Sequence, residues 1–141
     1  MQVRPVNGQS TGDGMPILNL NLSAAVDDTL KQRIAQQLTT LTSSVLGKNS
    51  GLTVVRINDS KNQWFVGGER VSKSVVFHLE ITITQNTNTF EQIDSWIYSA
   101  YAALKDILGG VDGAPNYIAV TCMDGQFWGF DGLTQYVRSG R

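Results

Sequence analysis

In the stretch MPILNLNL, residues 15–22, apolar and polar side chains alternate. A period of two predicts a β-strand with one buried face and one open face. Pro16 suits the first position of such a strand, because no ladder hydrogen bond needs a donor there. The folded part of the chain is therefore predicted to begin with a strand that starts at Pro16.

A long amphipathic helix is predicted after this strand. Asp27 and Asp28 lie near its start, where carboxylates interact favourably with the helix dipole. Gly47 can end the helix, because glycine readily adopts the left-handed conformation of a C-cap. The apolar stripe of this helix, with spacings of 4, 4, 3 and 4 residues, consists of Leu30, Ile34, Leu38, Leu41 and Val45.

The same order of elements occurs twice. A strand over 53–57, a polar turn over 58–63 and a short strand over 64–68 complete the first unit. The second unit is predicted to contain a strand over 75–84, a helix that a Thr89–Gln92 capping box begins and Gly109-Gly110 ends, a strand over 117–121 and a segment over 126–130. The apolar stripe of this second helix consists of Phe90, Ile93, Ile97, Tyr101, Leu104 and Leu108. Because Gln63-Trp64-Phe65 and Gln126-Phe127-Trp128 lie 63 positions apart, we infer an internal repeat of about 60 residues.

The repeat predicts an α+β fold built from two fused βαβ units, about 16–70 and 75–132, within one domain over 16–141. Each unit should hold two parallel strands joined by a right-handed crossover. Together they would form a four-stranded sheet with two helices on one face. The other face is expected to be bare and apolar, so that it needs a partner. Residues 1–15, polar and rich in glycine, are interpreted as a flexible extension.

The composition narrows the classes of function. The 141 residues are 41% hydrophobic and 16% charged, with a net charge of -1 and no cluster of Lys and Arg, so a nucleic-acid partner is not expected. No apolar run approaches the length of a membrane span, and the N-terminus lacks a signal-peptide core, so a cytoplasmic protein is expected. Cys122 cannot form an intrachain disulfide and is interpreted as a buried strand thiol. Because no metal-ligand spacing or dinucleotide motif occurs, we expect neither a metal nor a cofactor.

Three pieces of the first unit resemble 4-oxalocrotonate tautomerase and its relatives: MPI at 15–17, LTVVRI at 52–57 and WFVGGE at 64–69. The length of two fused units is similar to that of malonate semialdehyde decarboxylase, cis-3-chloroacrylic acid dehalogenase and macrophage migration inhibitory factor. The resemblance covers about residues 16–132 and implies a tautomerase-like, MIF-like fold. It also implies a homotrimer around a central barrel of sheets.

The resemblance implies an isomerase that performs keto–enol tautomerisation of a small 2-oxo or 2-hydroxydienoate acid without a cofactor. In this family an N-terminal proline acts as base and acid, a role that would fall on Pro16. Arg56 would bind the substrate carboxylate, and Trp64 would be the aromatic residue of the substrate-binding pocket. Each has a plainer interpretation: Pro16 as a strand-starting residue, Arg56 as an ion-pair residue, and Trp64 as a core or interface aromatic.

Two departures from the family pattern bear on activity. Fifteen residues precede Pro16, and while they remain its nitrogen is an amide that cannot act as a base. Translation from Met15 with removal of the methionine, or processing of the extension, would expose it. The arginine pair of the dehalogenase and decarboxylase branches is missing at 83–86, which favours a simple tautomerase. A related dehalogenase or decarboxylase activity, or a non-catalytic trimeric binding protein with Pro16 blocked, are the alternatives.

Overall fold

One mixed sheet organises the fold of the computed structural model, which describes residues 15–140. Its four strands are β1 (Ile17–Leu22), β2 (Val54–Asp59), β5 (Phe77–Thr84) and β6 (Tyr117–Met123), in the order β2-β1-β5-β6. The pairs β1–β2 and β5–β6 are parallel, and the central pair β1–β5 is antiparallel. The expected extension over 1–15 lies, apart from Met15, outside the described residues.

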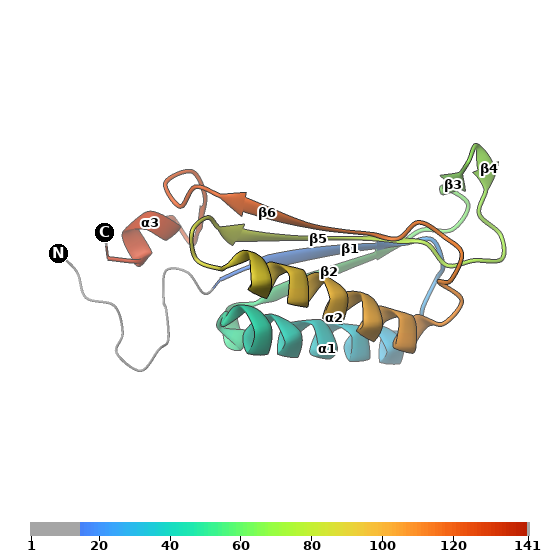
Figure 1. The fold of residues 1–141 in the computed structure, drawn as a ribbon, viewed down its shortest axis with the longest axis horizontal. Coiled ribbons are helices and arrows are strands. Elements are labelled where there is room, and N and C mark those ends of the chain that lie inside the picture. The colour runs from blue at the N-terminus through green and yellow to red at the C-terminus, as the bar shows by residue number, and fades with distance from the viewer. Residues whose placement is uncertain (1–14, 141) are drawn as a thin grey trace.

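Two helices cover one face of this sheet (Figure 1). They are α1 (Asp28–Leu46) and α2 (Phe90–Leu108), each of 19 residues. The end signals are confirmed: Asp27 Oδ1 accepts a hydrogen bond from Leu30 N at 2.8 Å, and Gly47 has a φ of 71°. The capping box of Thr89 and Gln92 is also present. The predicted α+β architecture, with a four-stranded sheet and two helices on one face, is therefore confirmed.

Two small hairpins stand at opposite ends of the sheet (Figure 1). Hairpin one consists of β3 (Phe65–Val66) and β4 (Glu69–Arg70), and hairpin two of β7 (Gly129–Phe130) and β8 (Leu133–Thr134). Because β1 and β5 run in opposite directions, their parallel partners β2 and β6 also run in opposite directions. Hairpin one follows β2 and hairpin two follows β6, so the hairpins lie at opposite ends of the strands. A 3-10 turn (Ser50–Leu52) precedes β2, and a short helix α3 (Gln135–Arg138) follows hairpin two. Neither α3 nor β8 was anticipated from the sequence.

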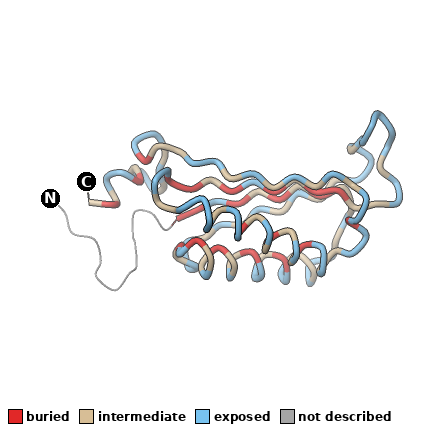
Figure 2. The backbone as a smooth tube through the Cα atoms, in the orientation of Figure 1, coloured by how far each residue is buried: buried red, intermediate tan, exposed pale blue. Residues whose placement is uncertain are grey.

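The core lies between the sheet and the two helices, as the buried positions in Figure 2 show. Trp96 is fully buried there, and its indole N–H donates to Thr42 Oγ1 at 3.2 Å, which joins α2 to α1. The predicted stripe of α2 was partly wrong, because Phe90 is 87% exposed and Trp96 and Ala100 take the central positions. The fully buried strand residues on the helix side are Leu18, Leu20, Leu22, Phe77, Leu79 and Ile81.

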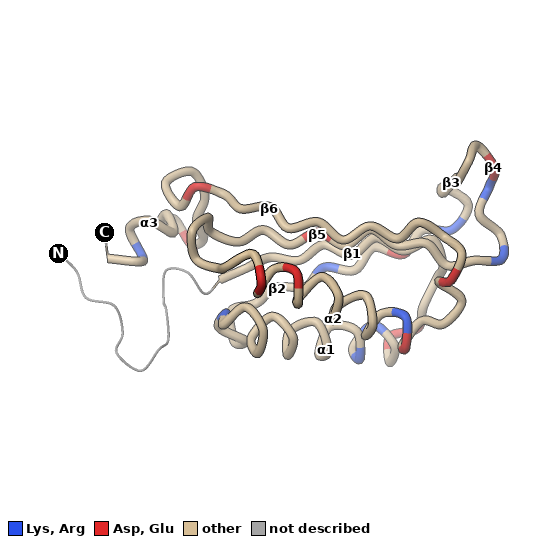
Figure 3. The backbone as a smooth tube through the Cα atoms, viewed as in Figure 1, with Lys and Arg blue, Asp and Glu red and all other residues tan. Residues whose placement is uncertain are grey.

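The sheet face away from the helices is polar in its middle rows, so the expectation of an apolar face was partly wrong; exposed apolar side chains occur towards its ends, at Ile17, Val54 and Tyr117. The cross-strand register aligns Arg56 with Asn19 and Asn19 with Glu80. Asn21 and His78 form the next row. Charges are nevertheless sparse along the four strands (Figure 3). Asn19 and Asn21 of β1 lie on this face, because alternate residues of a strand point to opposite faces of the sheet.

Cys122 is exposed, so the interpretation of a buried thiol was also wrong. It lies near the end of the edge strand β6, two residues beyond Val120, which packs against the core. Within residues 15–140 no helix is long and apolar enough to cross a membrane.

Candidate active site

Pro16 lies at the start of β1 beside a pocket of about 400 Å³. Its side chain is buried, and its carbonyl oxygen accepts a hydrogen bond from Val54 N at 3.2 Å. The neighbouring Met15 is 8% exposed and also lines the pocket. Three segments build the walls, which consist of Met15, Pro16, Ile17, Gly51, Leu52, Thr53, Val54, Trp128, Gly129, Phe130, Asp131 and Gln135.

The second unit supplies the aromatic wall of this pocket. Trp128 is half-buried, and its indole N–H donates to Thr84 Oγ1 at 3.2 Å. Its carbonyl oxygen accepts a hydrogen bond from Gln135 N at 2.9 Å, which ties α3 to hairpin two. The Arg138 guanidinium lies 3.8 Å from the centre of the Phe130 ring and donates to the Phe130 carbonyl at 3.0 Å. These contacts hold the wall in place against the start of β1.

Gly129 allows the close approach of the two strands in hairpin two. A Cβ atom at this position would overlap the Leu133 carbonyl oxygen and lie 2.6 Å from Thr134 Cα. Since both neighbours are backbone atoms, they cannot move aside without opening the hairpin. The glycine is therefore required by packing and helps to fix the wall that carries Trp128.

The three residues singled out from the sequence do not meet within one chain. Arg56 is exposed and pairs with Asn19, three residues beyond Pro16, so about 10 Å of strand separates the two backbone positions. Trp64 precedes hairpin one, at the end of the sheet opposite to Pro16 (Figure 1). Only Pro16 of the three lines the pocket. Arg56 and Trp64 could join it only from another copy of the chain.

Trp128, the aromatic residue that does lie beside Pro16, was missed as a pocket residue. The repeat contained the signal, because Gln126-Phe127-Trp128 is the second copy of Gln63-Trp64-Phe65. What the sequence did not reveal is that the two units pack antiparallel. That packing brings the second copy of the motif, and not the first, to the start of β1.

The pocket is mostly apolar, and among the described residues its single charged lining residue is Asp131. Since no cationic side chain of residues 15–140 lines it, a bound carboxylate would need a cation from elsewhere. In the described part of the chain, no group of three or more His, Cys, Asp or Glu side chains could hold a metal ion. The arrangement can enclose a small, flat organic molecule between Pro16 and the aromatic wall.

No protein-family model matches the sequence, and no curated protein matches it. Solved structures do match. The fused 4-OT wild-type asymmetric trimer F6 is similar with a TM-score of 0.72 at 17% identity, over 86% of this chain and 97% of that one. N1, a member of the cis-3-chloroacrylic acid dehalogenase family, is similar with a TM-score of 0.71 at 20% identity, over 84% and 82%. A macrophage migration inhibitory factor-like protein from Entamoeba histolytica gives 0.66 at 24% identity, over 85% and 98%.

These neighbours all have the tautomerase superfamily fold. This chain has the same fold, which confirms the fold that the sequence resemblance implied. The fused 4-OT neighbours are described as trimers.

Proposed function

We propose that this protein is a cofactor-independent tautomerase for a small 2-oxo or 2-hydroxydienoate acid, with Pro16 as base and acid in a form whose chain begins at Pro16. The observation that carries the proposal is the position of Pro16 beside an apolar pocket of about 400 Å³. The aromatic wall and the tautomerase superfamily fold are consistent with it.

An N-terminal proline is a secondary amine with chemistry that an internal proline lacks. A free α-amine has a pKa of about 7.7–8.0, and an apolar pocket lowers the pKa because it disfavours the charged form. The neutral amine can then remove a proton from the carbon beside a carbonyl and return it further along the conjugated chain. The reaction needs no metal and no cofactor.

Arg56 is proposed to bind the substrate carboxylate from a neighbouring copy in a homotrimer. Among residues 15–140 of one chain, the charged group that lines the pocket is the carboxylate of Asp131, which repels an anionic substrate. Arg56 is exposed on the open sheet face, and no ion pair joins it to a residue within 15–140. A guanidinium binds a carboxylate through two parallel hydrogen bonds and offsets charge that develops on an enolate. Trp64 of a neighbouring copy would close the pocket in the same way.

The test is the state of the Pro16 nitrogen. Mass spectrometry of the native protein should show a chain that begins at Pro16. A recombinant chain translated from Met15, with the methionine removed, should convert the enol of phenylpyruvate or 2-hydroxymuconate. The full chain, in which Pro16 is an amide, is the matched control and should be inactive.

Replacing the proline in the exposed form tests the mechanism itself. Pro16→Ala should lower kcat/KM by roughly 10²–10⁴-fold, the usual contribution of a general base. Full activity in this variant would refute the role of Pro16. A native chain that begins at Met1 and shows no turnover would instead support a non-catalytic trimeric binding protein.

A second candidate reaction rests on Asp131. Its carboxylate lines the pocket with Pro16 and could act as a general base towards water, as a related hydrolytic dehalogenase would require. Asp131→Asn should then abolish a hydrolytic activity and leave tautomerisation in place. Loss of both activities, or of neither, would argue against this second reaction.

A further inference from the structure

Gln135, the first residue of α3, is the most deeply buried polar side chain in the wall of the Pro16 pocket. It is 2% exposed and lies between this pocket and a neighbouring one of about 250 Å³. Its backbone N–H is satisfied by the Trp128 carbonyl oxygen. Its side-chain oxygen Oε1 is inaccessible to solvent and has no hydrogen-bond donor in the described part of the chain. A buried acceptor without a donor is unfavourable, so its presence calls for an explanation.

Three donors on the other walls of the pocket are already engaged. The Trp128 indole N–H donates to Thr84, and Gly51 N donates to Asn49 Oδ1. The Thr53 hydroxyl donates to the Asn49 carbonyl oxygen. The Pro16 nitrogen carries no hydrogen, because it is a tertiary amide while Met15 precedes it. It is the one lining group whose donor capacity changes when the chain begins at Pro16.

We propose that Gln135 Oε1 accepts a hydrogen bond from the Pro16 amine in the form whose chain begins at Pro16. This inference rests on the proposed function. Loss of the residues before Pro16 replaces the amide bond by an N–H, or by two N–H groups when the amine is protonated. With one N–H directed to Gln135, the lone pair of the neutral amine has a fixed direction towards the pocket. Gln135 is thus a positioning residue for the base.

The same contact affects the pKa of the amine. An acceptor favours the protonated form and so raises the pKa above that of an amine with no acceptor. Two other charged groups belong to this wall: Asp131, which lines the pocket, and Arg138, whose guanidinium stacks on Phe130. Both charges remain when only Gln135 is changed. A difference in the pKa of the Pro16 amine between the parent chain and the variant therefore reports on the side-chain amide of Gln135.

The first experiment compares thermal unfolding of Gln135→Met in two chains, the full chain and the chain that begins at Pro16. Both contain every described helix and strand. Methionine conserves the volume and removes the acceptor. In the full chain the variant should raise Tm by about 3 °C, because an unpartnered buried acceptor disappears. In the chain that begins at Pro16 it should lower Tm, because a hydrogen bond is lost.

The matched control is Gln126→Met. Gln126 is exposed and lines only the neighbouring pocket, so its effect on Tm should be the same in both chains. An equal change of Tm for Gln135→Met in both chains would overturn the proposal, since Gln135 would then be structural only. A chain beginning at Pro16 that does not unfold cooperatively would overturn it as well, because the contact requires a native fold.

A ¹⁵N NMR titration of the Pro16 nitrogen gives a second readout. In the chain that begins at Pro16, Gln135→Met should lower the pKa of the amine, because the acceptor that favours the protonated form is removed. An unchanged pKa would contradict the contact. Neither measurement requires turnover. If Gln135→Met changes Tm in opposite directions in the two chains but the chain that begins at Pro16 is inactive, the proposed function alone is refuted. If that chain is active but Tm changes equally in both chains, only the role of Gln135 is refuted.

Discussion

The residues that precede or begin the first strands of the two units, Pro16 and Phe77, occupy equivalent positions but have different surroundings. The register aligns Ile17 with Val54 and His78 with Tyr117, so Pro16 and Phe77 correspond. Phe77 is fully buried, and its N–H donates to Asn116 Oδ1 at 2.8 Å. Pro16 has no N–H and lies beside the pocket. At the start of β5 a large side chain fills the space and its backbone N–H has an acceptor. At the start of β1 a proline without an N–H lies next to a cavity.

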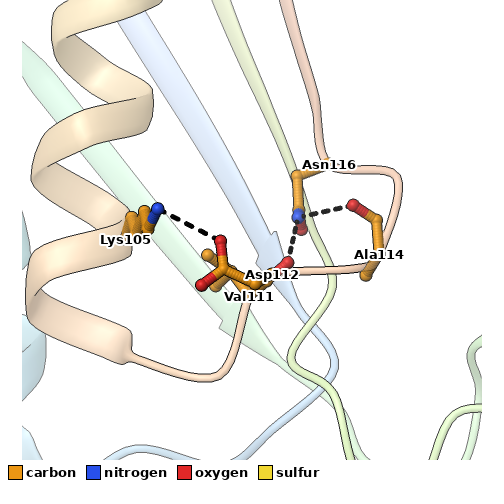
Figure 4. A network of polar contacts seen from close by, with 5 residues as sticks. All are labelled: Lys105, Val111, Asp112, Ala114 and Asn116. Atoms are coloured by element: carbon orange, nitrogen blue, oxygen red, sulfur yellow. Dashed lines mark hydrogen bonds and ion pairs between the residues drawn. The ribbon is translucent and has the colours of Figure 1, made fainter.

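The loop before β6 holds the filled site closed (Figure 4). The Asn116 side-chain amide donates to the carbonyl oxygens of Val111 and Ala114, at 3.0 and 3.1 Å. Lys105 forms an ion pair with Asp112 at 3.1 Å, which joins the loop to the end of α2. The residues before β2, in contrast, line the Pro16 pocket. The repeat thus keeps one site as core and one as a cavity.

The largest expected difference between the two strand starts is in stability. Phe77→Ala should destabilise the protein by about 3–5 kcal/mol, the usual range for a buried phenylalanine. Pro16→Ala should reduce the free energy of unfolding far less, because Pro16 already borders a pocket and removing its ring opens little new cavity. Urea unfolding of the full chain measures both. Equal losses would show that the two starts are energetically alike and would break the comparison.

The two hairpins should also differ. Gly129→Ala should cost about 2–4 kcal/mol, because its Cβ would overlap backbone atoms of hairpin two. Gly67→Ala in hairpin one should cost only about 1–2 kcal/mol, since the space is open and the penalty comes from the φ of 60°. Chemical denaturation of both variants is the check. If Gly129→Ala is as mild as Gly67→Ala, hairpin two is not held as tightly as its contacts indicate.

Removing the side chain that satisfies Phe77 should have a smaller effect. Asn116→Ala leaves the Phe77 N–H without its acceptor and should cost about 1–3 kcal/mol. Amide hydrogen exchange should report faster exchange at Phe77 than in the parent chain. Protection that persists unchanged at Phe77 would mean that another acceptor replaces Asn116.

The smallest expected effect concerns the ends of β2 and β6. The backbone N–H of Val26, at 3.0 Å, and then Lys31, at 3.4 Å, lower the pKa of Asp59 from its ordinary value. A lowered pKa in the folded state gives stability that is present above the unfolded pKa and is lost as pH falls through the folded pKa. Asp59→Asn should therefore reduce Tm at pH 7, and this effect should fade progressively as the pH falls below about 4.

Cys122 offers the matched control for Asp59, because it lies 63 residues later at the corresponding position of β6. It is exposed and has no pairing of this kind with a helix-start loop among the described residues. Cys122→Ser should change Tm by the same small amount at pH 7 and at pH 3. If Asp59→Asn behaves in the same way, the carboxylate does not fasten the first helix.

Local signals predicted most of the elements, because each lies within a few residues of what it controls. Asp27, Gly47 and the Thr89–Gln92 capping box set helix ends through short-range hydrogen bonds. The four-residue helix α3 was missed because so short a segment has no apolar period. The predicted stripe of α2 contained Phe90 and Ile97, whereas the fully buried residues of this helix include Trp96, one position before Ile97. The polar sheet face was misjudged although its asparagines stand in the sequence.

The sequence by itself determined the two βαβ units, their helix ends and the unusual proline at the first strand. Those features follow from period, capping and backbone sterics, which act locally. Only the tertiary structure decided that Trp128, and not Trp64, stands beside Pro16 in one chain, and that Gln135 is buried there without a donor. The reason is the antiparallel pairing of β1 with β5, a contact between residues some 60 positions apart that no local pattern encodes.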